Sequence, residues 1–129
     1  MSVFGIGIDV VEIDRIERLL DKYGGRFAAK VFTETERDYC ETATRPALHY
    51  AARFCAKEAV AKAFGTGIGA DLGWLDMEVQ RAASGAPRLL LSGAGKRFAE
   101  SKGIVAVMIS LTHAADYAAA NALAVTAST

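Results

Sequence analysis

Two glycines in the first apolar segment constrain this chain more than any other feature. Residues 3–10, Val-Phe-Gly-Ile-Gly-Ile-Asp-Val, are rich in β-branched side chains, and Gly5 and Gly7 stand at alternate positions. Because alternate residues of a strand point to the same face, the segment predicts a buried strand with one face bare of side chains. Another backbone or a ligand can approach such a face closely, and Asp9 ends the strand.

The rest of the sequence predicts helices and strands that form one α+β domain over residues 1–129. A first helix is expected at 11–23, ending at Gly24-Gly25, and a short second helix begins at the capping box of Thr33 and Glu36. A long helix is expected at 47–64, between Pro46 and Gly65, and a last one at 92–101. Strands are expected at 76–82 and 88–91, joined by a turn, and at 104–112 and 117–125. This order favours helices packed on a mainly antiparallel sheet.

The composition excludes several classes of protein. The chain has 15 Lys plus Arg and 15 Asp plus Glu, so its formal net charge is zero, without the basic excess of a nucleic-acid-binding domain. No apolar stretch reaches the roughly 18 residues of a membrane helix, and no signal peptide is apparent. Cys40 and Cys55 lack the spacing of a metal or redox pair, which favours reduced thiols. We therefore expect a cytoplasmic protein that binds neither nucleic acid nor membrane.

Charged residues in two segments suit metal and phosphate chemistry. Asp9 is either a cation ligand or, with Glu12, a capping box for the next helix, and composition alone favours capping. Phe54, Glu58 and Lys62 are four residues apart, so they share one helix face. Glu58 and Lys62 are then either an exposed ion pair or a carboxylate and an ammonium that hold magnesium beside a phosphate.

Two further patterns have a functional and a structural interpretation each. Ser110-Leu-Thr-His113 ends a predicted strand, where it can contact phosphate or ribose, although a solvent-facing histidine is the simpler interpretation. His49 carries no signal and is taken as a helix-surface residue. A basic stripe is formed by Arg15, Arg18, Lys22 and Arg26, with Gly24-Gly25 interrupting it before Arg26. The stripe is either an ordinary solvated face or a docking edge for an acidic protein.

Four groups of residues, taken in order, resemble the holo-acyl-carrier-protein synthases, the small 4′-phosphopantetheinyl transferases. They are Gly5-Ile-Gly-Ile-Asp9-Val-Val-Glu12-Ile13 with Arg15-Ile16; Arg53-Phe-Cys-Ala-Lys-Glu58-Ala with Lys62-Ala-Phe-Gly65-Thr-Gly67; Gly85-Ala-Pro87; and Ser110-Leu-Thr-His113 with Asp116-Tyr-Ala-Ala. Each motif alone is weak, but the ordered set spans nearly the whole chain.

The resemblance implies a function in fatty acid biosynthesis. The family transfers the 4′-phosphopantetheine arm of coenzyme A to a serine of apo-acyl carrier protein, and adenosine 3′,5′-bisphosphate is the other product. The serine hydroxyl attacks the β-phosphorus, with Mg²⁺ on the pyrophosphate. The resemblance also implies a homotrimer whose active sites lie at subunit interfaces, with Asp9, Glu58 and Lys62 from one chain and the Ser-Leu-Thr-His segment from a neighbour.

The resemblance assigns roles residue by residue. Asp9 and Glu58 match the metal ligands, Lys62 matches the pyrophosphate-binding lysine, and Glu58 is also placed to take the serine proton, directly or through water. Positions around coenzyme A are matched by Arg53, Phe54, Lys62, Gly65, Thr66, Thr112 and His113. Positions that dock the acidic carrier are matched by Arg15, Lys22 and Arg26.

Two positions depart from the family's pattern. Met108 stands where a histidine is common, and Ser84-Gly-Ala86-Pro87 stands where Asn-Gly-Lys-Pro is common. These departures bear on the finer contacts to coenzyme A and not on the metal site. Three alternatives remain: the same transfer to polyketide-type carriers, a non-catalytic carrier-binding trimer, and a regulator that only holds an adenosine bisphosphate.

Overall fold

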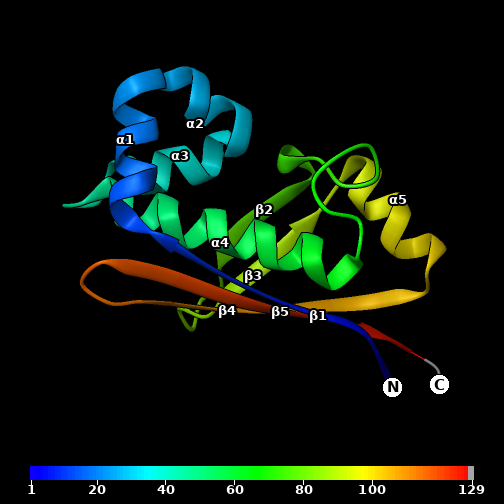
Figure 1. Ribbon diagram of the computed structural model, residues 1–129. Coiled ribbons are helices and arrows are strands. Elements are labelled where there is room, and N and C mark those ends of the chain that lie inside the picture. The colour runs from blue at the N-terminus through cyan, green and yellow to red at the C-terminus, as the bar shows by residue number, and fades with distance from the viewer. Residues whose placement is uncertain (128–129) are drawn as a thin grey trace.

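An α+β architecture is built on a three-stranded antiparallel sheet. The computed structural model describes residues 1–127. The strands are β1 (Ser2–Glu12), β4 (Ile104–His113) and β5 (Tyr117–Thr126), in the order β1-β5-β4. Figure 1 shows this sheet as one layer, with a long helix lying across it and both termini near the same end. The predicted fold class and the predicted final strand pair are confirmed.

Helices and a separate hairpin cover the long helix. They are α1 (Ile13–Tyr23), α2 (Gly25–Val31), α3 (Glu34–Glu41), α4 (Pro46–Phe64), the 3₁₀ turn η1 (Trp74–Asp76), the hairpin strands β2 (Met77–Arg81) and β3 (Pro87–Leu91), and α5 (Gly93–Ser101). The Thr33–Glu36 capping box is present at the start of α3. Within the described residues, no helix is both long enough and apolar enough to cross a membrane.

The long helix α4 is the centre of the core. Pro46 occupies its first turn, and Gly65 ends it with a φ of 76°, a left-handed conformation that glycine adopts without steric cost. Its alanines let β1 and β5 pack closely, and a Cβ atom added at Gly7 would lie 1.9 Å from the carbonyl oxygen of Ala59. The bare face of the first strand thus exists because the backbone of α4, not a ligand, lies against it.

The opposite face of the sheet is open to solvent, contrary to the prediction that the first strand is buried. Exposed apolar side chains there include Ile6 (70%), Ile8 (69%), Val10 (61%) and Met108 (54%). Ile6 and Met108 are aligned through Leu123, so they share this face. We call the face of the sheet that these four residues share the open sheet face. An apolar strand is normally covered on both faces of its sheet. Here no element of the described chain covers the second face.

Near the N-terminus, the predicted end of the first strand is wrong, and one short helix was not predicted. The first strand does not end at Asp9 but continues through Glu12, because β5 pairs with it as far as Tyr117. Gly24 does end α1, with a φ of 54°, but the chain resumes a helix at once as the seven-residue α2. The sequence did not predict α2, because its helix depends on burying Ala28 and Val31 rather than on a long periodic pattern.

Candidate active site

Asp9 and Lys62 meet where β1 crosses α4. The Lys62 ammonium donates to the carboxylate Oδ1 of Asp9 at 3.3 Å and to the backbone oxygen of Ile8 at 2.8 Å. Asp9 is half-buried and Lys62 is mostly exposed, so the pair opens to solvent. Because Glu12 is the N-cap of α1, the alternative that Asp9 belongs to a capping box is wrong.

Glu58 stands one turn before Lys62 and is half-buried beside Asp9. Burial raises the pKa of its carboxyl first, and the neighbouring Asp9 carboxylate raises it further, while Lys62 and Arg15 act in the opposite direction. Two carboxylates that repel each other at the edge of solvent are a suitable place for a divalent cation. Within residues 1–127, no group of three or more His, Cys, Asp or Glu could hold a metal. Asp9 and Glu58 offer two carboxylates, and magnesium commonly takes one or two carboxylates and completes its shell with phosphate and water.

Aromatic side chains form one border of this cluster. The rings of Phe54 and Trp74 stack with centroids 5.2 Å apart, and the Arg15 guanidinium lies 6.0 Å from the Phe54 centroid. Phe54 and Glu58 are one turn apart on α4, as the spacing predicts. Arg15 therefore approaches the candidate site from α1, where its charge also favours the ionised form of Glu58.

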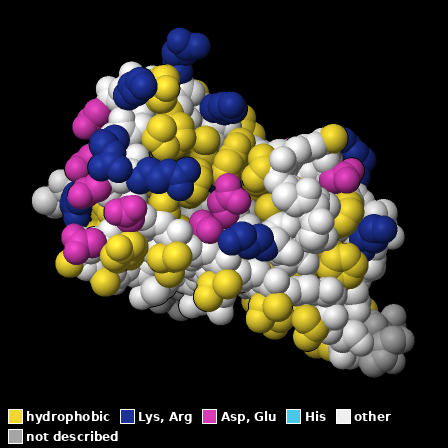
Figure 2. All heavy atoms as spheres, viewed as in Figure 1, with side chains coloured by type: hydrophobic (Ala, Val, Ile, Leu, Met, Phe, Trp, Pro, Cys, Tyr) yellow, Lys and Arg dark blue, Asp and Glu magenta, His cyan; other side chains and the backbone are white. Residues whose placement is uncertain are grey.

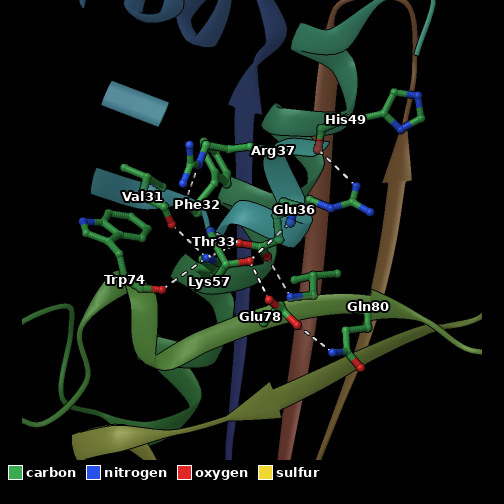
Figure 3. Close-up of polar contacts among 12 residues, drawn as sticks. Val31, Phe32, Thr33, Glu36, Arg37, His49, Lys57, Trp74, Glu78 and Gln80 are labelled. Atoms are coloured by element: carbon green, nitrogen blue, oxygen red, sulfur yellow. Dashed lines mark hydrogen bonds and ion pairs between the residues drawn. The ribbon is translucent and has the colours of Figure 1, made fainter. Parts of the chain in front are cut away.

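A buried network holds α4 against the other helices. Lys57 is fully buried, and its ammonium donates to Glu36 Oε1 at 2.6 Å, to the backbone oxygen of Val31 at 2.8 Å and to that of Trp74 at 3.2 Å (Figure 3). Glu36 in turn accepts from the backbone N–H of Val79 at 2.7 Å. Lys57 thus joins α4 to α2, α3 and η1, and Glu36 extends the network to β2. This network fixes the rotation of α4, and with it the direction in which the next residue, Glu58, points.

A pocket lies apart from the cluster of Asp9, Glu58 and Lys62. A pocket of about 240 Å³ is lined by residues of α4, the β2–β3 hairpin and the end of β4: His49, Ala52, Arg53, Val79, Arg81, Gly85, Pro87, Leu111, Thr112 and His113. Arg53, Thr112 and His113, three of the positions predicted around coenzyme A, therefore lie together. Lys62, Gly65 and Thr66 do not line this pocket: Lys62 is with Asp9, and Gly65 and Thr66 follow the end of α4.

Comparisons with known proteins identify the family. The family profile of the 4′-phosphopantetheinyl transferase superfamily matches residues 5–122. The chain belongs to this superfamily. The holo-[acyl-carrier-protein] synthase of Chlamydia trachomatis serovar L2 is 47% identical over 122 residues, 95% of this chain and 99% of the relative. That of Ruminiclostridium cellulolyticum is 44% identical over 119 residues, 92% of this chain and 89% of the relative.

Solved structures agree with this assignment. The crystal structure of the Neisseria meningitidis holo-[acyl-carrier-protein] synthase superposes with a TM-score of 0.91 at 34% identity, covering 97% of this chain and all of that one. The Helicobacter pylori enzyme, solved in complex with coenzyme A, gives a TM-score of 0.84 at 30% identity, covering 93% of this chain and 99% of that one. The α+β fold of this phosphopantetheinyl transferase is thus shared along nearly its whole length.

The basic stripe of this phosphopantetheinyl transferase is divided between two helices. Arg15, Arg18 and Lys22 are exposed on α1, but Arg26 lies beyond the break at Gly24, on α2. The interruption expected at Gly24-Gly25 is therefore present, and Arg26 continues the stripe from a different helix. A groove of about 340 Å³ lies at this corner, lined by Leu19, Tyr23, Arg26, Phe27 and Lys30. Figure 2 shows Lys and Arg side chains over α1 and α2 with apolar side chains between them.

Sequence reasoning missed four residues around these sites. His49, taken as an ordinary surface residue, lines the 240 Å³ pocket, and its position one turn before Arg53 could have indicated this. Lys57, Trp74 and Arg81 had no local signal, because each acts through contacts between elements far apart in the sequence.

Proposed function

We propose that this phosphopantetheinyl transferase transfers the 4′-phosphopantetheine arm of coenzyme A to a serine of apo-acyl carrier protein, for fatty acid biosynthesis. The products are holo-acyl carrier protein and adenosine 3′,5′-bisphosphate. The observation that carries the proposal is the cluster of Asp9, Glu58 and Lys62, drawn from β1 and α4 into one half-buried site. The likeness to holo-[acyl-carrier-protein] synthases over nearly the whole chain supports the same reaction.

Asp9 and Glu58 would hold a magnesium ion in this proposal. When bound, the ion would neutralise charge on the pyrophosphate oxygens. The exposed Lys62 ammonium adds a second positive charge beside them and would bind another pyrophosphate oxygen. Phe54, Gly65 and Thr66 would line the path of the coenzyme around this cluster, at the face and the end of α4.

Proton removal is assigned to Glu58. Its carboxylate lies half-buried beside Asp9, one turn of α4 before Lys62, where it can accept the serine proton as a general base. The serine oxygen forms a bond to the β-phosphorus, the bond to the bridging oxygen breaks, and the proton passes to Glu58 directly or through water. Adenosine 3′,5′-bisphosphate leaves with the bridging oxygen, whose charge Lys62 offsets.

We infer a homotrimer whose active sites combine residues of two chains. Within one chain, a pocket is lined by Arg53, Thr112 and His113, but not by Asp9 or Lys62, which pair elsewhere. In this proposal, each of the two groups supplies half of an active site. The open sheet face supports the inference, because an apolar patch of this kind usually marks an interface. A cytoplasmic location stays part of the proposal, which Cys40 and Cys55, both buried free thiols, support.

Subunit mixing tests the shared site. Asp9→Ala and His113→Ala variants should each be inactive or severely impaired when pure. If one site uses Asp9 of one chain and His113 of its neighbour, refolding the two variants together restores intact sites and part of the activity. If both residues act within one chain, every site in the mixture stays defective, and the interfacial arrangement is refuted. Refolding each variant alone is the control.

The exposed basic corner of α1 and α2 is proposed to dock the acidic carrier through Arg15, Lys22 and Arg26. Arg15→Glu should raise the KM for the carrier more than the KM for coenzyme A, and salt should reduce the difference. Arg97→Glu, an exposed charge reversal on α5, is the matched control. Equal effects of Arg15→Glu on both substrates would contradict docking.

A panel of apo-carriers separates the remaining alternatives. Comparable rates on fatty-acid and polyketide-type carriers would replace the narrow function with a broad one. Carrier binding without transfer would support a non-catalytic trimer, and binding of adenosine 3′,5′-bisphosphate without turnover would support a regulator.

A further inference from the structure

A buried ion pair anchors α4 at the residue that comes directly before Glu58. The side chains of Lys57 and Glu36 are both 0% exposed, and the Lys57 ammonium lies 2.6 Å from Glu36 Oε1. The ammonium also donates to the backbone oxygens of Val31, the last residue of α2, and Trp74, the first residue of η1 (Figure 3). A single side chain therefore ties α4 to three other elements at one point.

The Glu36 carboxylate divides its two oxygens between separate elements. Its Oε1 accepts from the Lys57 ammonium and, at 2.8 Å, from the backbone N–H of Thr33 in the capping box of α3. Its Oε2 accepts from the backbone N–H of Val79 on β2 at 2.7 Å. The β2–β3 hairpin is not part of the three-stranded sheet, so Glu36 is a direct link between this hairpin and the anchor of α4.

Stability alone does not explain why the core keeps this ion pair. Replacing a buried pair by apolar side chains of similar volume is often neutral or stabilising, whereas a buried polar network can specify one arrangement of the elements around it. Half of the buried residues of α4 are alanines, whose short side chains give neighbouring elements few projections by which to fix the rotation of the helix. The directed hydrogen bonds of Lys57 supply that orientation.

We propose that Lys57 and Glu36 are positioning residues for the transfer reaction, because they hold α4 at the rotation that places the Glu58 carboxylate beside Asp9. This inference rests on the proposed function. Asp9 lies on β1 and Glu58 on α4, so any rotation of α4 about its axis changes the distance between the two carboxylates. A displacement of about 1 Å at a reacting group can cost about a hundredfold in rate. Lys57 and Glu36 are fully buried, so they act through Glu58 and not on a substrate.

A double variant separates positioning from stability. Lys57→Met alone leaves the Glu36 charge unpaired and loses stability, whereas Lys57→Met with Glu36→Gln removes both charges, and the glutamine oxygen can still accept from Val79. We would measure kcat well below the lowest Tm, the free energy of unfolding in urea, and the calorimetric affinity for adenosine 3′,5′-bisphosphate. The double variant should recover stability relative to Lys57→Met and keep the affinity of the wild type, but its kcat should stay about tenfold or more below that of the wild type. Val125→Ala is the control: it removes buried volume from β5, five residues along the strand from the partner of Asp9, and should lose stability but keep its kcat.

Two outcomes would overturn the inference while the proposed function stands. If the double variant has the kcat of the wild type, the ion pair serves stability alone. If its affinity for adenosine 3′,5′-bisphosphate falls as much as its kcat, or if Val125→Ala loses as much kcat, the loss reflects a general loosening of the fold and not the placement of Glu58. A wild type that transfers no phosphopantetheine arm gives a different result: it refutes the proposed function, and the inference falls with it.

Discussion

Replacing Lys57 by methionine should be among the most destabilising single changes in this chain. Methionine nearly keeps the side-chain length, so packing changes little. The ammonium that serves Glu36, Val31 and Trp74 is lost, however, and the Glu36 carboxylate remains fully buried without its counter-ion. Breaking a buried pair in this way costs about 3–5 kcal/mol. At roughly 2.1 cal/mol/K of unfolding entropy per residue, this corresponds to a fall in Tm of about 10–18 °C.

Urea denaturation of a double-mutant cycle would measure the effect. Glu36→Gln added to Lys57→Met should recover about 2 kcal/mol, because the uncompensated charge disappears. Lys62→Met is the matched control: its side chain is 53% exposed, so the same change should cost no more than about 1 kcal/mol. A cost below about 1 kcal/mol for Lys57→Met, or no recovery with Glu36→Gln, would refute the argument that this pair holds α4 in place.

The glycine face, the Glu58 carboxyl and the two thiols give three further tests. Gly7→Ala should lower the free energy of unfolding by about 1–3 kcal/mol or more, because its Cβ would meet the backbone of α4. Gly25→Ala is the control and should be nearly neutral, because the space around Gly25 is open. Similar free energies of unfolding for the two variants would contradict the close approach of β1 to α4. Without metal, the pKa of Glu58 is raised in the folded state, so the folded state binds more protons than the unfolded state above pH 4.5. The stability of the wild type therefore falls as the pH rises from 4.5 to the raised pKa. Across that interval the Tm of Glu58→Gln should rise relative to that of the wild type, and a pH-independent Tm difference would contradict the argument. Burial raises the pKa of Cys40 and Cys55 to about 12, so iodoacetamide near pH ~8 should label them only in urea, and rapid labelling of the folded chain would contradict their burial.

Local signals predicted the elements whose ends are set by local chemistry. Pro46 and Gly65 delimit α4, and the Thr33–Glu36 pair caps α3, because these residues act through their own backbone conformation and hydrogen bonds. The short α2 was missed because it forms through packing of Ala28 against the core rather than through its own pattern.

Tertiary contacts explain what the sequence left open at the site. The helical spacing put Glu58 and Lys62 on one face, but only the packing of β1 on α4 brings Asp9 to them. Composition favoured a capping role for Asp9, and the pairing of β1 with β5 past that residue excludes it. Arg81 could not be predicted, because its place at the pocket depends on a ring contributed by α3. An apolar run such as β1 also does not indicate which of its faces the chain itself will cover.

The most direct test of the proposed function is the mass of an apo-acyl carrier protein after incubation with this enzyme, coenzyme A and Mg²⁺. The account predicts that the carrier gains the mass of one phosphopantetheine arm, on its serine, and that adenosine 3′,5′-bisphosphate appears in equal amount. A chelator, or the Asp9→Ala or Glu58→Ala variant with an unchanged circular dichroism spectrum, should abolish the gain. No gain with the wild type, or an undiminished gain with Asp9→Ala, would contradict the account.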